Sequence, residues 1–355
     1  MTLSILTPFP PQTDKMSKKV AAMAAMAAGA PLQRIELELA PLAADEVEIK
    51  ITHCGVCASD WHLAEGHWGP YSQFPNQVCG HEIVGTVAAA GPLVKGLALG
   101  ERVGVGWWKE ACEKCDCCAA DCQAACDKAV PTCAGGNKGG FAEAIRVKSL
   151  YAHPIPDALK SEDAAPLLCG GVTVYAPLVK HAPPSKTVGV VGLGGLGHLA
   201  VLFAKKRGNI VTAISGGEGK QALAAQLGAD RFLDMSDAAA LKAAADSLDV
   251  VLVTGAAPGF DHGLLLGLVK KLGTIVYVAA QTEDIKVNPM GHLLSKHIVV
   301  TGNTAGGHGS MRDMLRFAAA HGIKPMIEVF PFAEAQKALD GVKNNTTRFR
   351  GVLAM

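Results

Sequence analysis

The stretch "KTVGVVGLGGLGHLAVLFAKKRG", residues 186–208, combines a valine-rich run, a glycine cluster and a helix-like segment. "TVGVVG" predicts a short buried strand, and "HLAVLFAKKRG" predicts a helix that ends at Gly208. Gly192, Gly194 and Gly197 form the pattern G-x-G-x-x-G between them. A glycine turn in this context lets the backbone approach a pyrophosphate at the helix N-terminus, so the stretch predicts a dinucleotide-binding loop.

The segments that follow continue the alternation of strands and helices. Strand-like runs are "NIVTAIS", "DVVLVTG" and "TIVYVAA", and helix-like runs between them are "GKQALAAQLGA" and "GFDHGLLLGLVKKLG". Such alternation predicts an α/β fold with a doubly wound parallel sheet, the Rossmann arrangement.

The end of the second strand indicates which dinucleotide is bound. An acidic residue there would hold the ribose hydroxyl of NAD and repel a 2′-phosphate. The strand instead ends at Ser215, followed by Gly216 and Gly217, and Lys220 comes soon after. A hydroxyl and a nearby cation favour the phosphate of NADP, whereas Glu218 argues for NAD if it points inward.

The stretch "CEKCDCCAADCQAAC", residues 112–126, contains six of the chain's eleven cysteines. Cys112, Cys115, Cys118 and Cys126 have the spacing C-x2-C-x2-C-x7-C, which can enclose a tetrahedral ion. Four thiolates leave no open position, so this spacing predicts a structural zinc site.

Two alternatives stay open for this loop. Bacterial iron–sulfur spacing would have three residues before the last cysteine and a proline after it, and neither is present. In addition, Cys117, Cys122 or Cys133 could take the place of one of the four proposed ligands.

Three separate segments offer a second set of soft ligands. They are "HCGVCASDWH" at 53–62, "VCGHEIVG" at 78–85 and "APLLCGGVTVY" at 165–175. Each cysteine or histidine alone is typical of a packed core residue. Together they supply two thiolates and one imidazole, the donor set of a catalytic zinc with an open fourth position.

Composition excludes several classes of protein. The chain has 355 residues, of which 49% are hydrophobic, and its net charge is +1. The sequence lacks the basic stripe that is typical of nucleic-acid-binding proteins. It also has no apolar run long enough to span a membrane. "MSKKVAAMAAMAAGA", residues 16–30, loosely imitates a secretory signal, but strand-like sequence follows it. We therefore expect a cytoplasmic protein, with residues 1–15 a flexible extension or foreign to the natural chain.

From about residue 17 onward, the chain resembles the zinc-dependent medium-chain alcohol dehydrogenases, in their cinnamyl alcohol dehydrogenase-like branch. The resemblance rests on "HCGVCASDWH", "GHEIVG", the four-cysteine loop, "APLLCGGVTVYAPL", "GVVGLGGLGH" and "TRFRGV". It implies that Cys57, His81 and Cys169 bind a catalytic zinc, and that Glu82 can exchange into its coordination shell. It matches Cys112, Cys115, Cys118 and Cys126 to the family's structural zinc, which gives two zinc ions per chain.

The resemblance also implies roles for other positions. Ser59 would touch the substrate oxygen, His62 would end a proton relay to solvent, and Asp60 would orient His81. The residues implied in cofactor binding are the loop Gly192, Gly194, Gly195, Leu196 and Gly197, then Ser215 and Lys220 near the 2′-phosphate, and Arg350 at the pyrophosphate.

The implied architecture is a β-rich GroES-like catalytic domain over residues 1–165, completed by 304–355, with the Rossmann domain at 166–303. The family resemblance further suggests a homodimer through edge strands of the Rossmann domain. The implied reaction is reversible hydride transfer between NADP(H) and a primary alcohol or aldehyde, of aromatic or unsaturated type. The alternatives are an NAD-dependent polyol or secondary-alcohol dehydrogenase and a non-enzymatic binding protein on the same fold.

Several positions depart from the family pattern. Cys79 replaces a usual proline before "GHE", Ala58 replaces a frequent histidine, and Gln221 replaces an arginine common in NADP-using relatives. Cys54 lies in the same motif as Cys57, but it is expected to be a small buried residue. The four tryptophans are candidates for either a substrate pocket or the core: Trp61, Trp68, Trp107 and Trp108.

Overall fold

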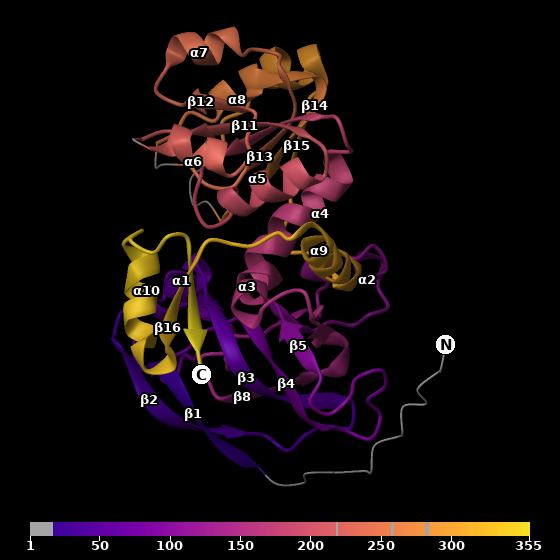
Figure 1. Ribbon diagram of the computed structural model, residues 1–355, viewed down its shortest axis with the longest axis vertical. Helices are drawn as coiled ribbons and strands as arrows, with labels where there is room; N and C mark the ends of the chain where they lie inside the picture. Colours follow the sequence, from indigo (N-terminus) through magenta and orange to yellow (C-terminus); the bar gives the residue numbers. More distant parts are fainter. Residues whose placement is uncertain (1–16, 218, 257–258, 281–283) are drawn as a thin grey trace. The chain divides into compact units, whose positions relative to one another are not determined.

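The structure is a computed structural model that describes residues 17–217, 219–256, 259–280 and 284–355. The expectation for residues 1–15 and the argument from Glu218 lie outside the described residues. The chain divides into two compact units (Figure 1). Unit 1 comprises Met1–Leu168 and Ile327–Met355, and unit 2 comprises Cys169–Met326.

Unit 2 is built on a six-stranded sheet in which all neighbouring strands are parallel. Its strands, in spatial order, are β12 (Arg231–Asp234), β11 (Ile210–Ser215), β10 (Thr187–Val191), β13 (Leu248–Val253), β14 (Val269–Tyr277) and β15 (Val299–Gly302). The strand that comes first in the chain is central, and later strands extend the sheet to both sides. This order is that of the Rossmann fold, so the prediction of a doubly wound parallel sheet is confirmed.

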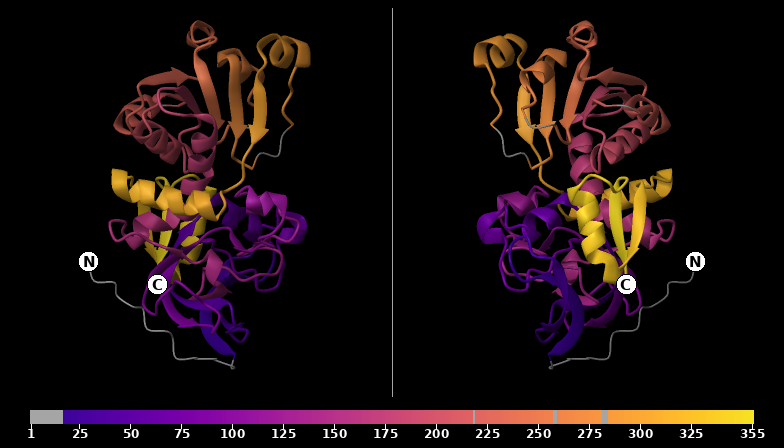
Figure 2. Two further views of the ribbon diagram at one scale, coloured as in Figure 1. Left: turned by 90° about the vertical axis from the view of Figure 1, so that its right-hand side faces the viewer. Right: turned by 90° about the vertical axis from the view of Figure 1, so that its left-hand side faces the viewer.

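Helices cover this sheet. They are α4 (Val172–His181), α5 (Gly197–Lys206), α6 (Lys220–Gln226), α7 (Ala238–Ala243), α8 (Gly263–Leu268) and α9 (His308–His321). Helix α5 packs on β10 and β11, and α6 packs on β12. Figure 2 shows α4 and α5, in magenta, gathered on one face of the sheet. The apolar strands are therefore shielded from water, as a parallel sheet requires.

The turn from β10 into α5 needs glycine at two positions. Gly192 has a φ of +87°, a backbone conformation that favours glycine. A Cβ atom at Gly197 would collide with the carbonyl oxygen of Gly192. The first and third glycines of the predicted loop thus allow the sharp turn and the close approach of helix to strand.

Unit 1 contains a seven-stranded sheet and two smaller hairpin-like pairs. The large sheet has the order β16 (Ile327–Pro331), β17 (Arg350–Ala354), β3 (Glu46–Val56), β4 (Glu82–Ala90), β5 (Arg102–Val105) and β9 (His153–Pro154), and β8 (Ala144–Lys148) also pairs with β3. The two-stranded pairs are β1 (Lys18–Ala25) with β2 (Leu32–Leu39), and β6 (Trp108–Glu110) with β7 (Val130–Pro131). The helices are α1 (Ala58–Ala64), α2 (Asp116–Ala119), α3 (Ser161–Pro166) and α10 (Ala335–Lys343).

The end of the chain completes unit 1. Strand β17 pairs antiparallel with β3, with Val352 opposite Gly55, and α10 packs against α1. Figure 2 shows this returning segment, in yellow, against the purple strands of the first part of the chain. Because β3 lies between β17 and β4, residues near both ends of the sequence meet around its C-terminal end.

The two compact units divide after Leu168 and after Met326. Helix α9 belongs to unit 2, where it packs against α4 and the Tyr175 hydroxyl donates a 2.7 Å hydrogen bond to Asp313. The domain boundaries expected from the sequence, at residues 165 and 303, stay a prediction. In the part of the chain that the structure describes, no helix is long and apolar enough to cross a membrane.

Asp249, at the start of β13, links two neighbouring strands of unit 2. Its carboxylate accepts hydrogen bonds from the Thr187 hydroxyl at 2.6 Å and from Lys270 at 3.0 Å. Burial alone would raise the pKa of Asp249, but the hydrogen bonds from Thr187 and Lys270 outweigh it and lower the pKa to about 2. The folded state therefore favours the carboxylate, and its stabilisation is present above the pKa of the unfolded chain, about 3.9.

We expect Asp249→Asn to lower the free energy of unfolding at pH 7 by about 1–3 kcal/mol. The difference from the parent chain should shrink as the pH falls from about 4 toward 2, because the parent carboxylate then becomes protonated. Urea unfolding monitored at several pH values measures this difference. An equal difference at pH 3 and pH 7 would show that charge on Asp249 does not contribute.

Candidate active site and metal centres

Four potential ligands from three segments converge on one point: Cys57, His81, Glu82 and Cys169. One donor atom from each lies within 4.8 Å of the others. Cys57 follows β3 and is the N-cap of α1, while His81 directly precedes β4 and Glu82 is its first residue. Cys169 lies in the helical turn Leu167–Gly171, which continues directly from α3. The structure thus brings together all the residues suggested for the catalytic zinc.

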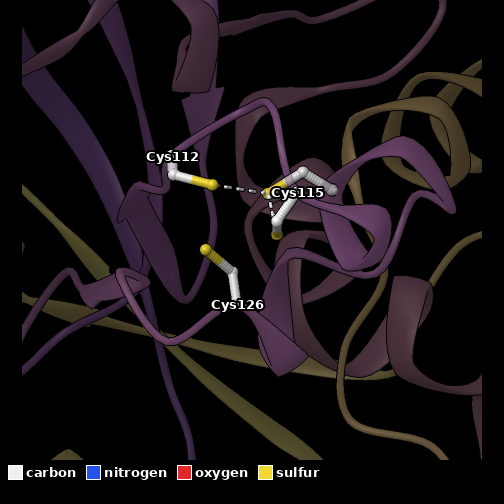
Figure 3. Close-up of side chains that lie close together, drawn as sticks. Cys112, Cys115 and Cys126 are labelled. Carbon is white, nitrogen blue, oxygen red and sulfur yellow. Dashed lines mark hydrogen bonds between the residues drawn. The ribbon is translucent and has the colours of Figure 1, made fainter.

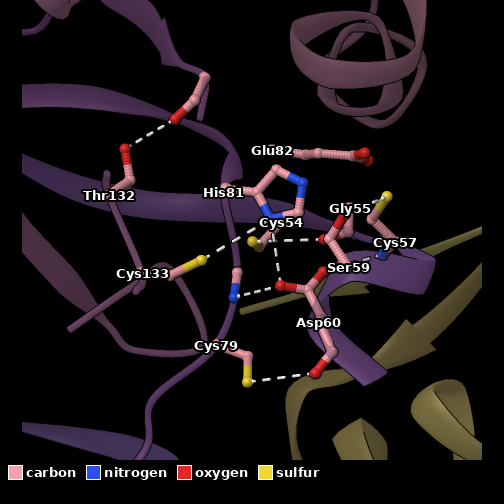
Figure 4. A network of polar contacts seen from close by, with 12 residues as sticks. Cys54, Gly55, Cys57, Ser59, Asp60, Cys79, His81, Glu82, Thr132 and Cys133 are labelled. Atoms are coloured by element: carbon pink, nitrogen blue, oxygen red, sulfur yellow. Dashed lines mark hydrogen bonds and ion pairs between the residues drawn. The ribbon is translucent and has the colours of Figure 1, made fainter. Parts of the chain in front are cut away.

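Asp60 holds two of these ligands in place from beneath (Figure 4). It is completely buried, and its carboxylate accepts hydrogen bonds from the backbone amides of Cys57 and Gly80, both at 2.8 Å. Its Oδ1 also lies 3.1 Å from Nδ1 of His81. An anion at this distance fixes Nδ1 as the protonated nitrogen of His81, so Nε2 carries the lone pair for a metal. The expected orienting role of Asp60 has a geometric basis here.

Glu82 provides the test of whether a cation fits this group. Its side chain is fully buried, and its Oε2 has no hydrogen-bond partner among the described residues. Burial raises the pKa of Glu82, and Arg350 acts in the opposite direction. A buried carboxylate oxygen without a partner, next to two thiols and an imidazole, fits a divalent cation of zinc's ligand preference.

Arg350 was assigned to the cofactor pyrophosphate from the resemblance, but in the structure its Nη2 pairs with Glu82. Arg350 as a whole is only 4% exposed. Gly55, on the intervening strand β3, makes the pairing possible because a Cβ atom there would overlap the Glu82 carboxylate. The contact of Arg350 with a pyrophosphate stays a prediction.

Ser59 and His62 lie three residues apart on α1, on the same side of the helix. The Ser59 hydroxyl lies 3.8 Å from the Cys57 thiol, beside the ligand group. Nδ1 of His62 lies 3.0 Å from Nδ1 of His67, a neighbour that the sequence did not single out. Burial, together with His67, lowers the pKa of His62, so the neutral ring is favoured near neutral pH.

Aromatic rings adjoin this part of the site. Trp107 meets the His81 ring edge-on at 4.7 Å between centroids, and Trp68 stacks with His62 at 5.6 Å. Trp61 and His62 have their ring centroids 4.4 Å apart. All three tryptophans are partly buried against the core of unit 1, whereas Trp108 packs on the cysteine loop. Both roles foreseen for the tryptophans are thus consistent with their positions.

Three further thiols lie behind the site: Cys54, Cys79 and Cys133 are completely buried. Burial raises the pKa of each of them. Cys133 lies 3.8 Å from Nδ1 of His81 and forms a compact group with His81 and Asp60. Sequence spacing gave no indication of this contact, since Cys133 follows the cysteine loop rather than the histidine motif.

The second metal-ligand group consists of Cys112, Cys115, Cys118 and Cys126 (Figure 3). Their four sulfur atoms all lie within 4.8 Å of one another, and the Cys115 and Cys118 sulfurs are 3.6 Å apart. The spare thiols are not part of this group, so the geometry selects the four cysteines suggested by spacing. Four thiols without an imidazole or carboxylate fit a closed, tetrahedral zinc site.

The cofactor-binding candidates in unit 2 gather at the N-terminal end of α5. Ser215, at the end of β11, is 6% exposed. Lys220 donates a 2.9 Å hydrogen bond from Nζ to the carbonyl of Leu193, so its ammonium lies at the glycine loop of residues 192–197. Gln221, which replaces an expected arginine, is exposed on α6. Hydroxyl, cation and glycine loop are therefore adjacent within this unit.

Comparisons with known proteins agree with this arrangement. Residues 43–157 match the alcohol dehydrogenase GroES-like domain, and residues 195–320 match the zinc-binding dehydrogenase domain. A probable cinnamyl alcohol dehydrogenase of Oryza sativa subsp. japonica is 40% identical over 321 residues, covering 87% of this chain and 72% of the relative. An aldehyde reductase of Synechocystis sp. is 34% identical, covering 94% of this chain and 98% of the relative.

Solved structures give the same result. A cinnamyl alcohol dehydrogenase from Sorghum bicolor has a TM-score of 0.89 and 36% identity, covering 95% of this chain and 98% of that one. A cinnamyl alcohol dehydrogenase from Helicobacter pylori, complexed with NADP(H), has a TM-score of 0.86 and 26% identity, covering 96% and 99%.

The GroES-like unit, the Rossmann unit and the two ligand groups define a zinc-binding dehydrogenase. The chain belongs to the zinc-dependent medium-chain alcohol dehydrogenase family, in its cinnamyl alcohol dehydrogenase-like branch. It is accordingly an oxidoreductase of alcohols and aldehydes.

Proposed function

We propose that the protein is an NADP-dependent aldehyde reductase that binds two zinc ions and acts reversibly on primary alcohols of aromatic or unsaturated type. The observation that carries this proposal is the convergence of Cys57, His81, Glu82 and Cys169 around a buried carboxylate oxygen without a hydrogen-bond partner. The relatives named for cinnamyl alcohol and aldehyde chemistry support the substrate class.

The residues of the candidate active site have separate roles in metal binding and proton transfer. A zinc ion held by Cys57, His81 and Cys169 would supply Lewis-acid polarisation of the substrate oxygen. Asp60 keeps the His81 ring in the tautomer and orientation needed for binding. The hydroxyl of Ser59, beside Cys57, holds the proton that the substrate oxygen gains or loses. His62 and His67 form the next pair of proton-bearing groups, and exposed His67 connects them with solvent.

The rings beside His62 and His81 support the choice of a planar substrate. Trp107 and Trp68 lie edge to face at 5.9 Å between centroids, next to the ligand group. A flat aromatic or conjugated aldehyde can stack on such rings. Stacking adds binding free energy beyond that gained from burying the apolar surface of the substrate. Saturated polyols lack this interaction.

The preference for NADP is supported by Ser215 and Lys220, since a hydroxyl and an ammonium can both bind a phosphate. We expect Lys220→Ala to raise the KM for NADPH by about 10–100-fold, equal to about 1.4–2.7 kcal/mol, and to leave the KM for NADH nearly unchanged. Initial rates with cinnamaldehyde and each reduced cofactor measure this. Lys206→Ala, which removes a cation from the far end of α5, is the matched control.

If the parent chain uses NADH faster than NADPH, the cofactor assignment is wrong and an NAD-dependent polyol or secondary-alcohol dehydrogenase becomes the better description. If Lys220→Ala affects both cofactors equally, Lys220 acts on the shared part of the dinucleotide and not on the 2′-phosphate.

We also propose a homodimer formed through the edge strand β15. Val299 on β15 is 51% exposed, and the nearby segment leaves Leu294 63% exposed and Met290 72% exposed. An apolar edge of this kind is a template for pairing with a second copy. Sedimentation should give twice the chain mass of 36.7 kDa, and Val299→Lys should shift the protein to the monomer. A parent chain that sediments as a monomer contradicts the proposal.

A cytoplasmic location is supported by the thiols. In the part of the chain that the structure describes, no disulfide joins any of the cysteines, as is usual in a reducing compartment.

A further inference from the structure

Two thiols of the cysteine loop, Cys117 and Cys122, are not used by the proposed function. Neither belongs to any group of potential metal ligands among the described residues. Cys122 is exposed and Cys117 is half-buried, whereas the three thiols behind the active site are completely buried. Cys122 is therefore the cysteine of this loop that solvent-borne reagents reach most easily.

The C-terminal turn of α2 brings these two residues together. Asp121 has a left-handed conformation with a φ of +57°. The Cys122 amide donates a 2.9 Å hydrogen bond to the Cys117 carbonyl, and the Asp121 amide donates a 3.1 Å bond to Cys118. This pair of hydrogen bonds around a left-handed residue is a Schellman motif, in which the two residues corresponding to Cys117 and Cys122 commonly have their side chains in contact.

The hydrogen bond also limits the distance between the two residues. With standard bond lengths, an N–O distance of 2.9 Å keeps the two Cα atoms within about 6.8 Å of one another. Disulfides span Cα separations of about 4.4–6.8 Å, so the backbone needs little or no movement to allow a bond.

We propose that Cys117 and Cys122 form a peroxide-oxidisable pair that closes into a disulfide on the metal loop without involving the four metal ligands. The proposal goes beyond the dehydrogenase activity; the pairing depends on the fold of the loop, and its selectivity against Cys115 rests on the proposed zinc in the four-cysteine group. It assigns a modification site to the two cysteines that the metal-binding pattern leaves over.

The oxidant is hydrogen peroxide, and the reaction has two steps. The Cys122 sulfur attacks one peroxide oxygen, the O–O bond breaks, and water leaves as Cys122 becomes a sulfenic acid. The Cys117 sulfur then attacks the Cys122 sulfur, the S–O bond breaks, and a second water leaves as the S–S bond forms. Two thiols lose two electrons in total, and one peroxide is reduced to two waters.

Cys115 is the competing partner for Cys117, because it is the N-cap of α2 and precedes Cys117 by two residues. Cys115 is, however, one of the four sulfurs grouped as metal ligands. A thiolate bound to zinc has its lone pair engaged by the metal, so the zinc-loaded chain should favour Cys122. A bound zinc would thereby protect the four ligand thiols and leave Cys117 and Cys122 as the pair open to oxidation.

The test uses the full, zinc-loaded chain and one equivalent of hydrogen peroxide. Remaining thiols are then alkylated under denaturing conditions, and the tryptic peptide of residues 115–128 is analysed by tandem mass spectrometry. We expect a peptide in which Cys115, Cys118 and Cys126 are alkylated and Cys117 is joined to Cys122. Its mass should be two hydrogens lower than that of the same triply alkylated peptide with two free thiols. The zinc content, measured before and after peroxide, should be unchanged.

Two variants separate the steps. In Cys117→Ser the sulfenic acid on Cys122 cannot be resolved, so dimedone should trap it there. In Cys122→Ser neither the disulfide nor the trapped adduct should form, and loss of thiols should be more than about tenfold slower. Both variants should bind as much zinc as the parent chain.

Either of two results would overturn the proposal. One is a disulfide that includes Cys112, Cys115, Cys118 or Cys126 together with loss of zinc. The other is a peptide that stays fully reduced under a tenfold excess of peroxide. A low zinc content before peroxide is added would contradict the two-zinc proposal instead, because the mass of the peptide reports the disulfide independently of the metal.

Discussion

Replacing Cys57 by serine should reduce the zinc content from two ions per chain to one and lower kcat/KM for aldehyde reduction by at least about 1,000-fold, or about 4 kcal/mol. Cys57 is 8% exposed and supplies one of the two thiols in the group with His81 and Cys169. A serine hydroxyl is a poor zinc ligand, so the variant would keep one thiol in place of two and bind zinc much more weakly. Metal analysis and steady-state kinetics measure the two effects.

Cys54→Ser is the matched control, because Cys54 lies three residues earlier in the same motif and is completely buried. Its sulfur packs closely against Gly80 and Gly140, where a Cβ atom on either glycine would be too near it. Among the described residues, Cys54 belongs to no group of potential metal ligands. This variant should keep two zinc ions and most of the activity, with a modest loss of stability. If Cys57→Ser keeps both zinc ions and full activity, the ligand assignment is wrong.

Replacing Cys126 by serine should remove the other zinc ion and act mainly on stability. Cys126 is 7% exposed, and its sulfur accepts a 3.4 Å hydrogen bond from the Lys128 amide. The loop around it has only a small apolar core with Ala111, Cys118 and Tyr151, so bound metal must supply much of its folding free energy. We expect a loss of about 3–5 kcal/mol and a fall in Tm of about 10 °C, measured by thermal unfolding.

Cys122→Ser is the control for this second change, since Cys122 belongs to the same loop but is exposed. Its Tm should lie within about 2 °C of the parent value. Equal Tm values for Cys126→Ser and the parent chain would contradict a structural metal in this loop.

The features that could be predicted from the sequence are those fixed by local pattern. The valine-rich strands around "GVVGLGGLGH" are apolar throughout because both faces of the sheet are covered, and this made the Rossmann unit recognisable. The four ligands of the cysteine loop lie within fifteen residues, so spacing alone suggested them. The catalytic group required three distant segments: their donor types suggested a shared zinc site, and the family resemblance chose the individual ligands among them.

The features that could not be predicted depend on tertiary packing. The proximity of Cys133 to His81 arises from the chain path after the cysteine loop, and no spacing rule relates residues 52 positions apart. The pairing of Arg350 with Glu82 depends on β17 and β4 flanking β3, with Gly55 leaving room between them. Helix α9 buries Met311, Met314 and Leu315 and packs against α4, a contact that the apolar periodicity of α9 does not by itself specify.

Hydride transfer from NADPH to an aldehyde carbon can be followed directly with an isotope. Zinc-loaded protein is supplied with cinnamaldehyde and NADPH carrying deuterium at the reactive position of the nicotinamide, and the product is analysed by mass spectrometry. We expect cinnamyl alcohol with one deuterium on the alcohol carbon, and none when the opposite face of the nicotinamide is labelled. Failure of the zinc-loaded chain to form alcohol, or formation of alcohol without deuterium from either label, would contradict it.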